Sequence, residues 1–266
     1  MILPASYLNG FAPRDGQPLY PSLWRGCVGA WAPCLGPSGL TLRDWSGAAN
    51  HGTLTNMEAD SDWVTASGRW GLDFDGVNDR IGVARQPSYP MSISVCFSAG
   101  SNSRQYHTLY SNDQESLSPR TLMVLYRDSG STYFLSYYSG TYYHSSGFTL
   151  NVGEMCAYTI TLTSSGAVVM YRNGIKIGSN AAGIAGTVTA SAAWGNSSGL
   201  DSLSFGALGK MSFASIHNRV LSANEVQQMY SRVGVMMEMA PRRRSSSAVA
   251  VTSYSTFRPS VLRGSR

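Results

Sequence analysis

The sequence predicts an all-β fold in which antiparallel strands form a sandwich, and three observations lead to this prediction. Short runs of β-branched, aromatic and aliphatic residues recur along the 266-residue chain, with Gly, Asn, Asp or Ser between them. The 28 Gly and 11 Pro are scattered between these runs, as many turns joining many strands require. A hydrophobic fraction of 43% supplies enough apolar surface for a sizeable core. We therefore expect one domain, 23–233, between extended arms at 1–22 and 234–266.

The expected elements follow in chain order. Residues 1–22 hold four prolines and no apolar period, so this N-terminal arm is expected to be extended. Strand character then recurs in short runs bounded by turn residues. These runs are Val28–Trp31, Gly71–Phe74, Arg80–Val83, Ser92–Phe97, His107–Tyr110, Leu122–Tyr126, Tyr133–Tyr138, Glu154–Leu162, Ala167–Arg172, Ile175–Ile177, Leu203–Ala207 and Phe213–His217.

Two local signals are sharper than the rest. Asn173 and Gly174 tolerate positive φ at both central turn positions, so they predict a type I′ hairpin between the flanking strands. Ser222 and Glu225 form an S-x-x-E capping box, which predicts the start of a helix over Ser222–Arg232. This is the one substantial helix that we expect.

Positive charge is concentrated in the C-terminal arm. Between residues 241 and 266 there are six Arg and no acid, so subtracting six from the formal +5 leaves about −1 for residues 1–240. A nucleic-acid-binding body would need its own basic face, and we do not expect one. The arm is Arg- and Ser-rich with scattered apolar anchors, and nucleic-acid contact by its arginines remains an alternative. Its expected assembly contacts are Arg242, Arg243, Arg244, Tyr254, Phe257 and Arg258.

The cysteines bear on disulfide and metal-site formation, and the first residues bear on whether a signal peptide is present. Cys27 and Cys34 flank a Pro- and Gly-containing turn, which leaves a local disulfide open. Cys96 and Cys156 lie in strand-like runs, where a free Cys behaves as a small buried hydrophobe. No Cys/His spacing suggests a metal, and neither a signal peptide nor a membrane span is expected.

Five segments resemble, in order, motifs of the LamG-like branch of the concanavalin A-like lectin/glucanase superfamily. They are Gly26–Trp31, Arg43–Asn56 with its D-x-S-G-x-x-N-H-G-T-L pattern, Trp70–Arg80 with F-D-G-x-N-D, Met170–Gly174 with Y-x-N-G, and Ile216–Val226 with N-R-x-L-S-x-x-E-V. Together they run from Gly26 to Tyr230. The resemblance implies a two-sheet antiparallel jelly-roll sandwich with one short C-terminal helix and extended arms.

Most polar residues in these motifs are expected to hold loops together. Short Asp and Asn side chains bond to backbone in tight turns, and His51 and His217 fall inside motifs and are expected to be structural. A Ca²⁺ site near Asp44, Asp75 or Asp79 stays an alternative, although we expect no metal and no cofactor. The residues assigned this structural role are Asp44, Asn50, His51, Asp75 and Asn78.

The chain is not expected to be an enzyme. Glucanases of the resembled superfamily carry an E-x-D-x-x-E strand that supplies paired carboxylates. The nearest run, Glu58–Asp62, falls in a polar loop and lacks the final Glu. Asp73 and Asp75 lie on the same face of a predicted strand, but Asp75 belongs to the structural F-D-G turn. No nucleophile elbow or phosphate-binding glycine motif is present.

One aromatic stretch, Tyr133–His144, is rich enough to suggest a contact surface. Its tyrosines could stack on sugar rings, or they could pair across strands and contact protein. The candidate contact residues are Tyr137, Tyr138, Tyr142 and Tyr143.

The function expected from these observations is structural rather than catalytic. LamG-like jelly rolls without a signal peptide resemble accessory proteins of tailed phages, so we expect a virion decoration (cement) or fibre-associated protein anchored through its arms. Its partners would be capsid subunits and copies of itself, with no membrane, in a virion assembled in the host cytoplasm. The alternative is a carbohydrate-binding, lectin-like module that contacts surface glycans.

Overall fold

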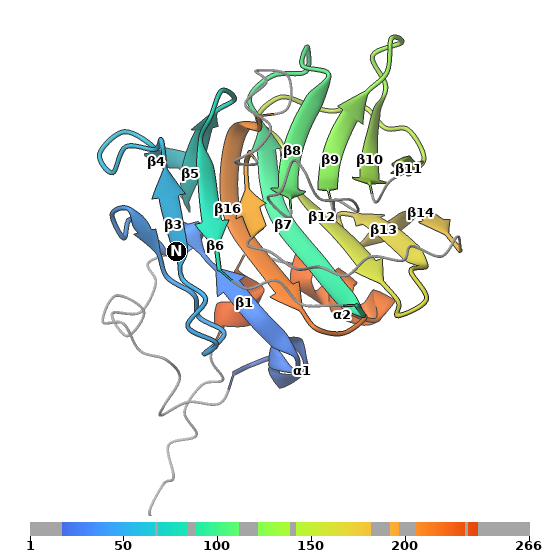
Figure 1. The fold of residues 1–266 in the computed structure, drawn as a ribbon, viewed down its shortest axis with the longest axis horizontal. Helices are drawn as coiled ribbons and strands as arrows, with labels where there is room; N and C mark the ends of the chain where they lie inside the picture. The colour runs from blue at the N-terminus through green and yellow to red at the C-terminus, as the bar shows by residue number, and fades with distance from the viewer. Residues whose placement is uncertain are drawn as a thin grey trace, which may run out of the picture.

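Two antiparallel sheets lie face to face in the described part of the chain (Figure 1). The structure is a computed structural model that describes residues 18–66, 69–84, 89–111, 122–138, 142–181, 192–196, 206–231 and 234–238. Every strand pairing in both sheets is antiparallel. The predicted all-β, two-sheet antiparallel sandwich is therefore confirmed.

One sheet, which we call the back sheet, carries the longest strands. Its strands are β1 (Cys27–Trp31), β4 (Trp63–Ala66), β5 (Arg69–Asp75), β7 (Met91–Ala99), β12 (Met155–Leu162), β13 (Val168–Arg172), β14 (Ile175–Asn180) and β16 (Leu208–His217). They are ordered β14-β13-β12-β7-β16-β5-β4, and β1 also pairs with β16. In β7, Ile93, Val95 and Phe97 face the core, while Ser94 and Cys96 between them face outward.

The other sheet, the front sheet, is assembled from shorter strands. It contains β2 (Thr41–Leu42), β3 (Gly52–Thr55), β6 (Arg80–Val83), β8 (Tyr106–Ser111), β9 (Leu122–Arg127), β10 (Tyr133–Tyr138), β11 (Tyr142–His144) and β15 (Ala192–Trp194). Their order is β11-β10-β9-β8-β15-β6-β3-β2, so β11 is an edge strand next to β10. β8, β9 and β10 lie side by side in Figure 1.

Large aromatic side chains occupy the core between the sheets. Trp194 makes edge-on contacts with Trp31 at 5.6 Å and with Tyr110 at 5.0 Å between ring centroids. All three are fully buried. The Trp31 indole Nε1 donates to the Asn50 carbonyl at 2.9 Å, which ties the β2–β3 loop to the core. These contacts join strands that are distant in sequence, as a sandwich requires.

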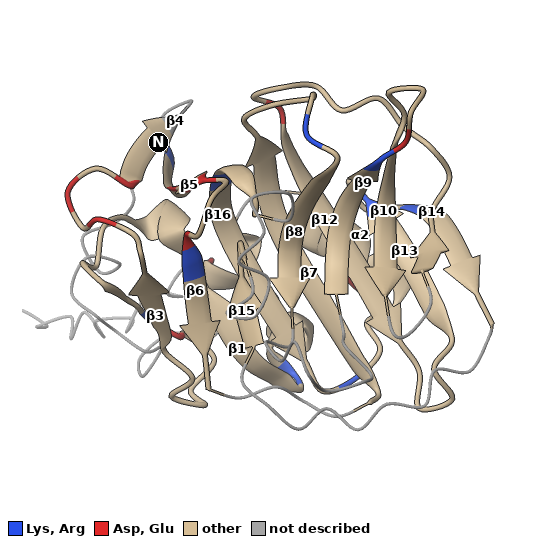
Figure 2. Ribbon diagram, turned by 45° about the horizontal axis from the view of Figure 1, so that its top comes forward, with Lys and Arg blue, Asp and Glu red and all other residues tan. Residues whose placement is uncertain are grey.

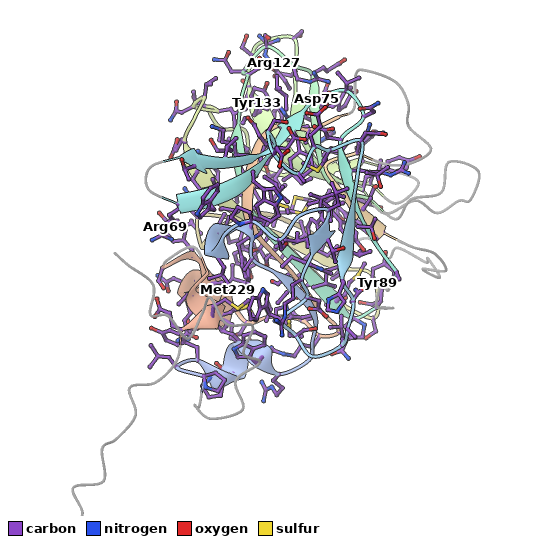
Figure 3. All side chains as sticks on the ribbon, turned by 90° about the vertical axis from the view of Figure 1, so that its left-hand side faces the viewer. Arg69, Asp75, Tyr89, Arg127, Tyr133 and Met229 are labelled. Carbon is purple, nitrogen blue, oxygen red and sulfur yellow. The ribbon has the colours of Figure 1, made fainter. Side chains whose placement is uncertain are left out.

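A second apolar cluster covers the outer face of the back sheet. It is formed by short helical segments packed on outward-facing residues such as Cys96 and Phe213. These segments are α1 (Pro21–Trp24), η2 (Pro33–Leu35), α2 (Ala223–Tyr230) and η3 (Val235–Met237). In Figure 3, Met229 of α2 lies toward the end of the sandwich opposite Arg127 and Tyr133. No helix in the described ranges has the length and apolar character to cross a membrane.

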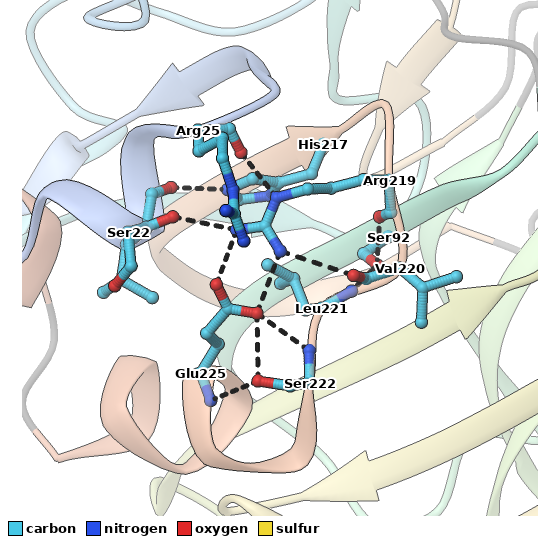
Figure 4. A network of polar contacts seen from close by, with 10 residues as sticks. Ser22, Arg25, Ser92, His217, Arg219, Val220, Leu221, Ser222 and Glu225 are labelled. Atoms are coloured by element: carbon cyan, nitrogen blue, oxygen red, sulfur yellow. Dashed lines mark hydrogen bonds and ion pairs between the residues drawn. The ribbon is translucent and has the colours of Figure 1, made fainter.

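Arg219 links the N-terminal segment to α2 (Figure 4). Its Nε donates to the Arg25 carbonyl at 2.6 Å and its Nη2 to the Ser22 carbonyl at 2.8 Å. The same guanidinium forms an ion pair with Glu225, whose carboxylate accepts from the Ser222 backbone N–H in the capping box. Nearby, His217 Nε2 donates to the Leu23 carbonyl at 2.8 Å. Side chains at the end of β16 and just after it therefore position α1.

Most of the predicted elements are found where the sequence placed them. Asn173 and Gly174 have φ of 53° and 78°, as the predicted hairpin requires, and α2 begins after the capping residue Ser222. Arg232, the expected end of that helix, and residues 203–205 of the expected strand Leu203–Ala207 lie outside the described residues, and residues 206 and 207 do not belong to a strand. The short strands β2, β3, β4, β11 and β15 were not predicted, because two- to four-residue runs carry little periodicity.

The ends of the described chain differ from simple extended arms. Pro21 and Ser22 are helical, since proline fits the first position of a helix, where its missing N–H is not needed. Val235, Met236 and Met237 are buried against the back sheet rather than extended away from it. Leu19 N donates to the Glu238 carbonyl at 2.8 Å, so residues near the two ends of the described chain lie next to each other.

All four cysteines are free thiols, so the Cys27–Cys34 disulfide that the sequence left open is not formed. Burial raises the pKa of Cys27, Cys34 and Cys96 to about 12 in each case. Cys156 is buried on the core side of β12. Cys27, Cys34 and Cys96 are therefore protonated at neutral pH, and all four cysteine side chains pack as apolar groups.

Candidate functional site

The alternation of β10 divides its side chains between the core and the outer surface of the front sheet. Tyr133, Leu135 and Tyr137 belong to the buried core between the sheets. Because successive side chains of a strand point to opposite faces, Phe134, Ser136 and Tyr138 lie on the outer face. The strand therefore carries aromatic side chains on both faces: those on one face pack in the core, and those on the other lie on the outer surface of the front sheet.

Aromatic side chains from four adjacent strands meet on this outer face. Tyr106 of β8 lies 5.4 Å from Tyr126 of β9, and Tyr126 lies 5.3 Å from His144 of β11, measured between ring centroids. His144 stacks on Tyr142 at 5.8 Å with an interplanar angle of 6°. We call this set the aromatic row. Its members are Tyr106, Tyr126, Phe134, Tyr138, Tyr142 and His144.

Strand register brings the members of the row together. Tyr126 lies directly opposite both Tyr106 and Phe134, and Tyr138 lies opposite Tyr142. Directly opposed side chains have Cβ atoms about 4.5–5.5 Å apart, so aromatic pairs touch without distorting the backbone. The 4.6 Å centroid distance between Tyr138 and Tyr142 reflects this pairing. The row is thus a consequence of cross-strand pairing over β8–β11.

The row is accessible and uncharged. Tyr142 is 37% exposed, His144 is exposed, and the other members are half-buried. Arg127 is the sole charged residue within β8–β11, and the ribbons of β8, β9 and β10 are tan over most of their length in Figure 2. Partial desolvation lowers the pKa of His144 and raises the pKa of Tyr106, so both side chains are neutral at pH 7.

Two of the four predicted contact tyrosines belong to the row, and two do not. Tyr138 and Tyr142 stack on the outer face as described. The prediction for Tyr137 is wrong, because this side chain points into the core and its hydroxyl lies 2.6 Å from that of Tyr89. Tyr143 pairs with Tyr137 and packs against the core, half-buried. Period-2 alternation through the hairpin could have separated these pairs.

Four members of the row were missed from the sequence. Phe134 and His144 lie within the aromatic stretch and follow the alternation of Tyr138 and Tyr142, so the hairpin register could have identified them. Tyr106 and Tyr126 come from β8 and β9, and they join the row through strand pairing that local sequence does not specify.

Asp44 organises the loop between β2 and β3. Its Oδ1 accepts from the backbone N–H groups of Ala30 and Ser46, and its Oδ2 accepts from the Asn50 N–H and the Ser46 hydroxyl. The His51 Nδ1 accepts from the Asp44 N–H at 3.1 Å. The carboxylate oxygens are therefore engaged within the loop, which is the arrangement of a structural residue.

The Asp75–Asp79 turn is organised in the same way. Asp79 Oδ2 accepts from the Asp75 N–H at 2.8 Å, and Asp75 Oδ1 accepts from the Val77 N–H at 2.7 Å. The Asn78 carbonyl accepts from the side chain of Asn56. Burial, assisted by the neighbouring carboxylates, raises the pKa of Asp79 to about 6. Within the described ranges, no group of three or more His, Cys, Asp or Glu could hold a metal ion.

The carboxylates considered for catalysis lie away from the row. Glu58 donates its N–H to Asp62 Oδ2 at 2.7 Å in the loop before β4, and Asp73 lies on β5 of the back sheet, where burial raises its pKa. Several acidic residues lie around β4, β5 and the loop before them in Figure 2. The arm residues Arg242, Arg243, Arg244, Tyr254, Phe257 and Arg258 lie outside the described residues.

Comparison with solved structures shows the same fold in carbohydrate-active proteins. Domain 4 of AbnA, a GH43 extracellular arabinanase from Geobacillus stearothermophilus solved with arabinotriose, is 15% identical, with a TM-score of 0.58 over 77% of this chain and 98% of that chain. Trypanosoma rangeli sialidase in complex with sialic acid is 13% identical, with a TM-score of 0.56 over 77% of this chain. This chain spans 32% of that sialidase. At these levels of sequence identity, the similarity shows a shared fold.

Sequence comparison identifies the family. No curated protein matches the sequence. The family model described as the concanavalin A-like lectin/glucanases superfamily (Laminin_G_3) matches residues 75–227, which is more than half of the 266 residues. This match covers the strands that carry the aromatic row. The chain belongs to the concanavalin A-like lectin/glucanases superfamily.

Proposed function

We propose that this chain is a carbohydrate-binding module that holds a glycan on the aromatic row without cleaving it. The observation that carries the proposal is the unbroken contact of accessible, uncharged rings across four adjacent strands. Four strands span about 14 Å at the usual spacing, enough for a short oligosaccharide. Flat rings pack on the apolar faces of sugars, and phenol hydroxyls bond to sugar hydroxyls.

The structural neighbours support this proposal at the level of the fold. The arabinanase domain was solved with arabinotriose, and this chain covers nearly the whole of that domain. The fold alone does not identify a binding surface. The aromatic row does, because its rings and hydroxyls can stack on a sugar and form hydrogen bonds with it. The rings also form one contiguous, partly exposed set, and contiguous apolar patches on a surface mark contact sites.

Binding without hydrolysis follows from the placement of the carboxylates. A glycosidase that uses paired acids needs two carboxyl groups on either side of the bond it cleaves. The row has no carboxylate, and Glu58, Asp62 and Asp73 lie in the β4–β5 region instead. We therefore propose a protein that is not an enzyme and needs no cofactor.

The proposal is tested by ligand binding to matched variants. A glycan array would identify an oligosaccharide, and calorimetry would then compare Tyr142→Ala with Tyr230→Ala. Tyr230 is a suitable control, since it is 45% exposed on α2 behind the back sheet. Tyr142→Ala should weaken binding about tenfold or more through loss of the ring, and Tyr230→Ala should not. Absence of any glycan binding, or equal effects of both variants, would overturn the proposal.

A second role, anchoring in a large assembly, is also proposed, because residues near the two ends of the described chain lie side by side. Leu19 and Glu238 are joined by a backbone hydrogen bond on the back-sheet side, whereas the row is on the front sheet. The arm beyond residue 241 carries six Arg and no acid, which suits an acidic subunit. Such an assembly would be a phage virion, with capsid subunits and copies of this chain as partners.

This role is tested by deleting residues 241–266 and measuring incorporation into particles. The expected result is loss of incorporation with unchanged glycan binding. Full incorporation of the truncated protein would contradict the anchoring role. Capture of the full-length protein by nucleic acid, with a steep loss of binding as salt rises, would assign the arm to a different partner.

A further inference from the structure

His144 is the polar member of the aromatic row. Its imidazole is held between rings from three strands, stacked on Tyr142, tilted 30° against Tyr126 and edge-on to Phe134 at 5.8 Å. The orientation of the ring plane is thereby set by packing. Unlike its aromatic neighbours, this ring carries two nitrogens, and the position of its proton decides what it offers to a ligand.

Ser136 determines which nitrogen carries that proton. The Ser136 hydroxyl lies 2.7 Å from His144 Nδ1, and the Ser136 side chain is fully buried. Within the described chain, Nδ1 is the one hydrogen-bond partner of this hydroxyl. A buried hydroxyl needs an acceptor for its hydrogen. The serine therefore donates to Nδ1, and the imidazole proton resides on Nε2.

The opposite tautomer, with the proton on Nδ1 of His144, satisfies fewer hydrogen bonds. If Nδ1 carried the proton, it would donate to the Ser136 oxygen and leave the buried hydroxyl hydrogen without an acceptor. The titratable groups against His144 are the phenols of Tyr126 on β9 and Tyr142 on β11, while β10 contributes Phe134 and Ser136. Partial desolvation by the surrounding rings also lowers the pKa of His144, in keeping with a neutral ring.

We propose that His144 is the specificity-determining residue of the row, held by Ser136 with its Nε2–H available to donate to an oxygen of a sugar stacked on Tyr142. This inference rests on the proposed carbohydrate binding and adds a directional hydrogen bond to it. Stacking alone tolerates many sugars, whereas a fixed donor favours those with an acceptor oxygen at one place. Ser136 acts through His144 as a positioning residue.

The tautomer is tested first, on the full chain without ligand. Two-bond ¹H–¹⁵N spectra of the histidine rings should show His144 as the Nε2–H form, and Ser136→Ala should give a mixture of both forms. A predominant Nδ1–H form in the native protein would overturn the inference. This readout is independent of sugar binding, and circular dichroism verifies that Ser136→Ala is folded.

The ligand contact is tested by calorimetry with the oligosaccharide selected on the array. His144→Phe keeps a ring and removes the donor, so binding should weaken about tenfold, and His144→Gln should recover part of the loss because its amide donates. If Tyr142→Ala weakens binding and His144→Phe does not, this inference fails and the carbohydrate proposal stands. If no oligosaccharide binds the native protein, both fail.

Discussion

Arg219 and Glu225 form a bidentate ion pair, with Nη2–Oε1 at 2.7 Å and Nη1–Oε2 at 2.9 Å. The pair lowers the pKa of Glu225 to about 2, chiefly through the hydrogen bonds from Arg219. The same guanidinium also binds the carbonyls of Ser22 and Arg25. One side chain thus connects α1, the end of β16 and the first turn of α2.

Arg219→Ala should therefore destabilise the domain. The substitution leaves a largely buried carboxylate unpaired and removes two bonds to the N-terminal segment, so we expect a loss of about 3 kcal/mol in the free energy of unfolding. Urea unfolding would measure it. Lys176→Ala, at an exposed site on β14, is the control and should change stability by less than about 0.5 kcal/mol. Equal stability of the two variants would contradict the bridging role of Arg219.

Stability should fall as the pH drops from about 6.5 to 4. Burial lowers the pKa of His217 and of His107 to about 4, from an ordinary value of 6.5. In this window the unfolded chain takes up a proton at each histidine and the folded chain does not, so each costs about 3 kcal/mol by pH 4. Asp79 acts in the opposite direction, because its raised pKa of about 6 lets the folded state bind a proton first.

A histidine variant separates these contributions. His217→Gln keeps a donor for the Leu23 carbonyl and removes the titration, whereas Asp79 and His107 titrate as before. Between pH 7 and 4 the variant should lose about 3 kcal/mol less stability than the native protein, measured by urea unfolding at each pH. Parallel pH profiles for the two proteins would show that His217 is not buried as described.

Alanine substitutions at the neighbouring residues Tyr137 and Tyr138 should have different effects on stability and on glycan binding. Tyr137→Ala leaves a cavity in the core and should cost about 3–5 kcal/mol of stability. Tyr138→Ala removes a half-buried ring of the row and should cost about 1 kcal/mol or less while weakening glycan binding. Thermal melting would measure the stability of both variants, and calorimetry would measure their affinity for the glycan. The opposite pattern would place the wrong tyrosine on the surface.

The thiols should resist modification in the folded protein. Because Cys27, Cys34 and Cys96 have pKa values raised to about 12 and Cys156 is buried, a thiol reagent at pH 8 should react slowly with native protein. After denaturation without reductant, the four thiols should react together. Reaction of two thiols only would indicate a disulfide and contradict the free state of Cys27 and Cys34.

Much of the fold could be predicted because its signals are local. Turn residues between short apolar runs predicted the strands, and Asn173 and Gly174 predicted their hairpin through the backbone conformation that they allow. The capping box of Ser222 and Glu225 likewise predicted the start of α2. Each of these signals acts over a few residues, so the sequence alone is enough to read it.

The candidate site depended on contacts that no local pattern contains. Alternation shows that Tyr137 and Tyr138 face opposite ways, but burial of one face is decided by the sheet packed against it. Tyr106, Tyr126 and His144 become neighbours since β8, β9, β10 and β11 pair in one register. Strand pairing is set by hydrogen bonds and packing between distant segments, and so the tertiary structure alone assembled the aromatic row.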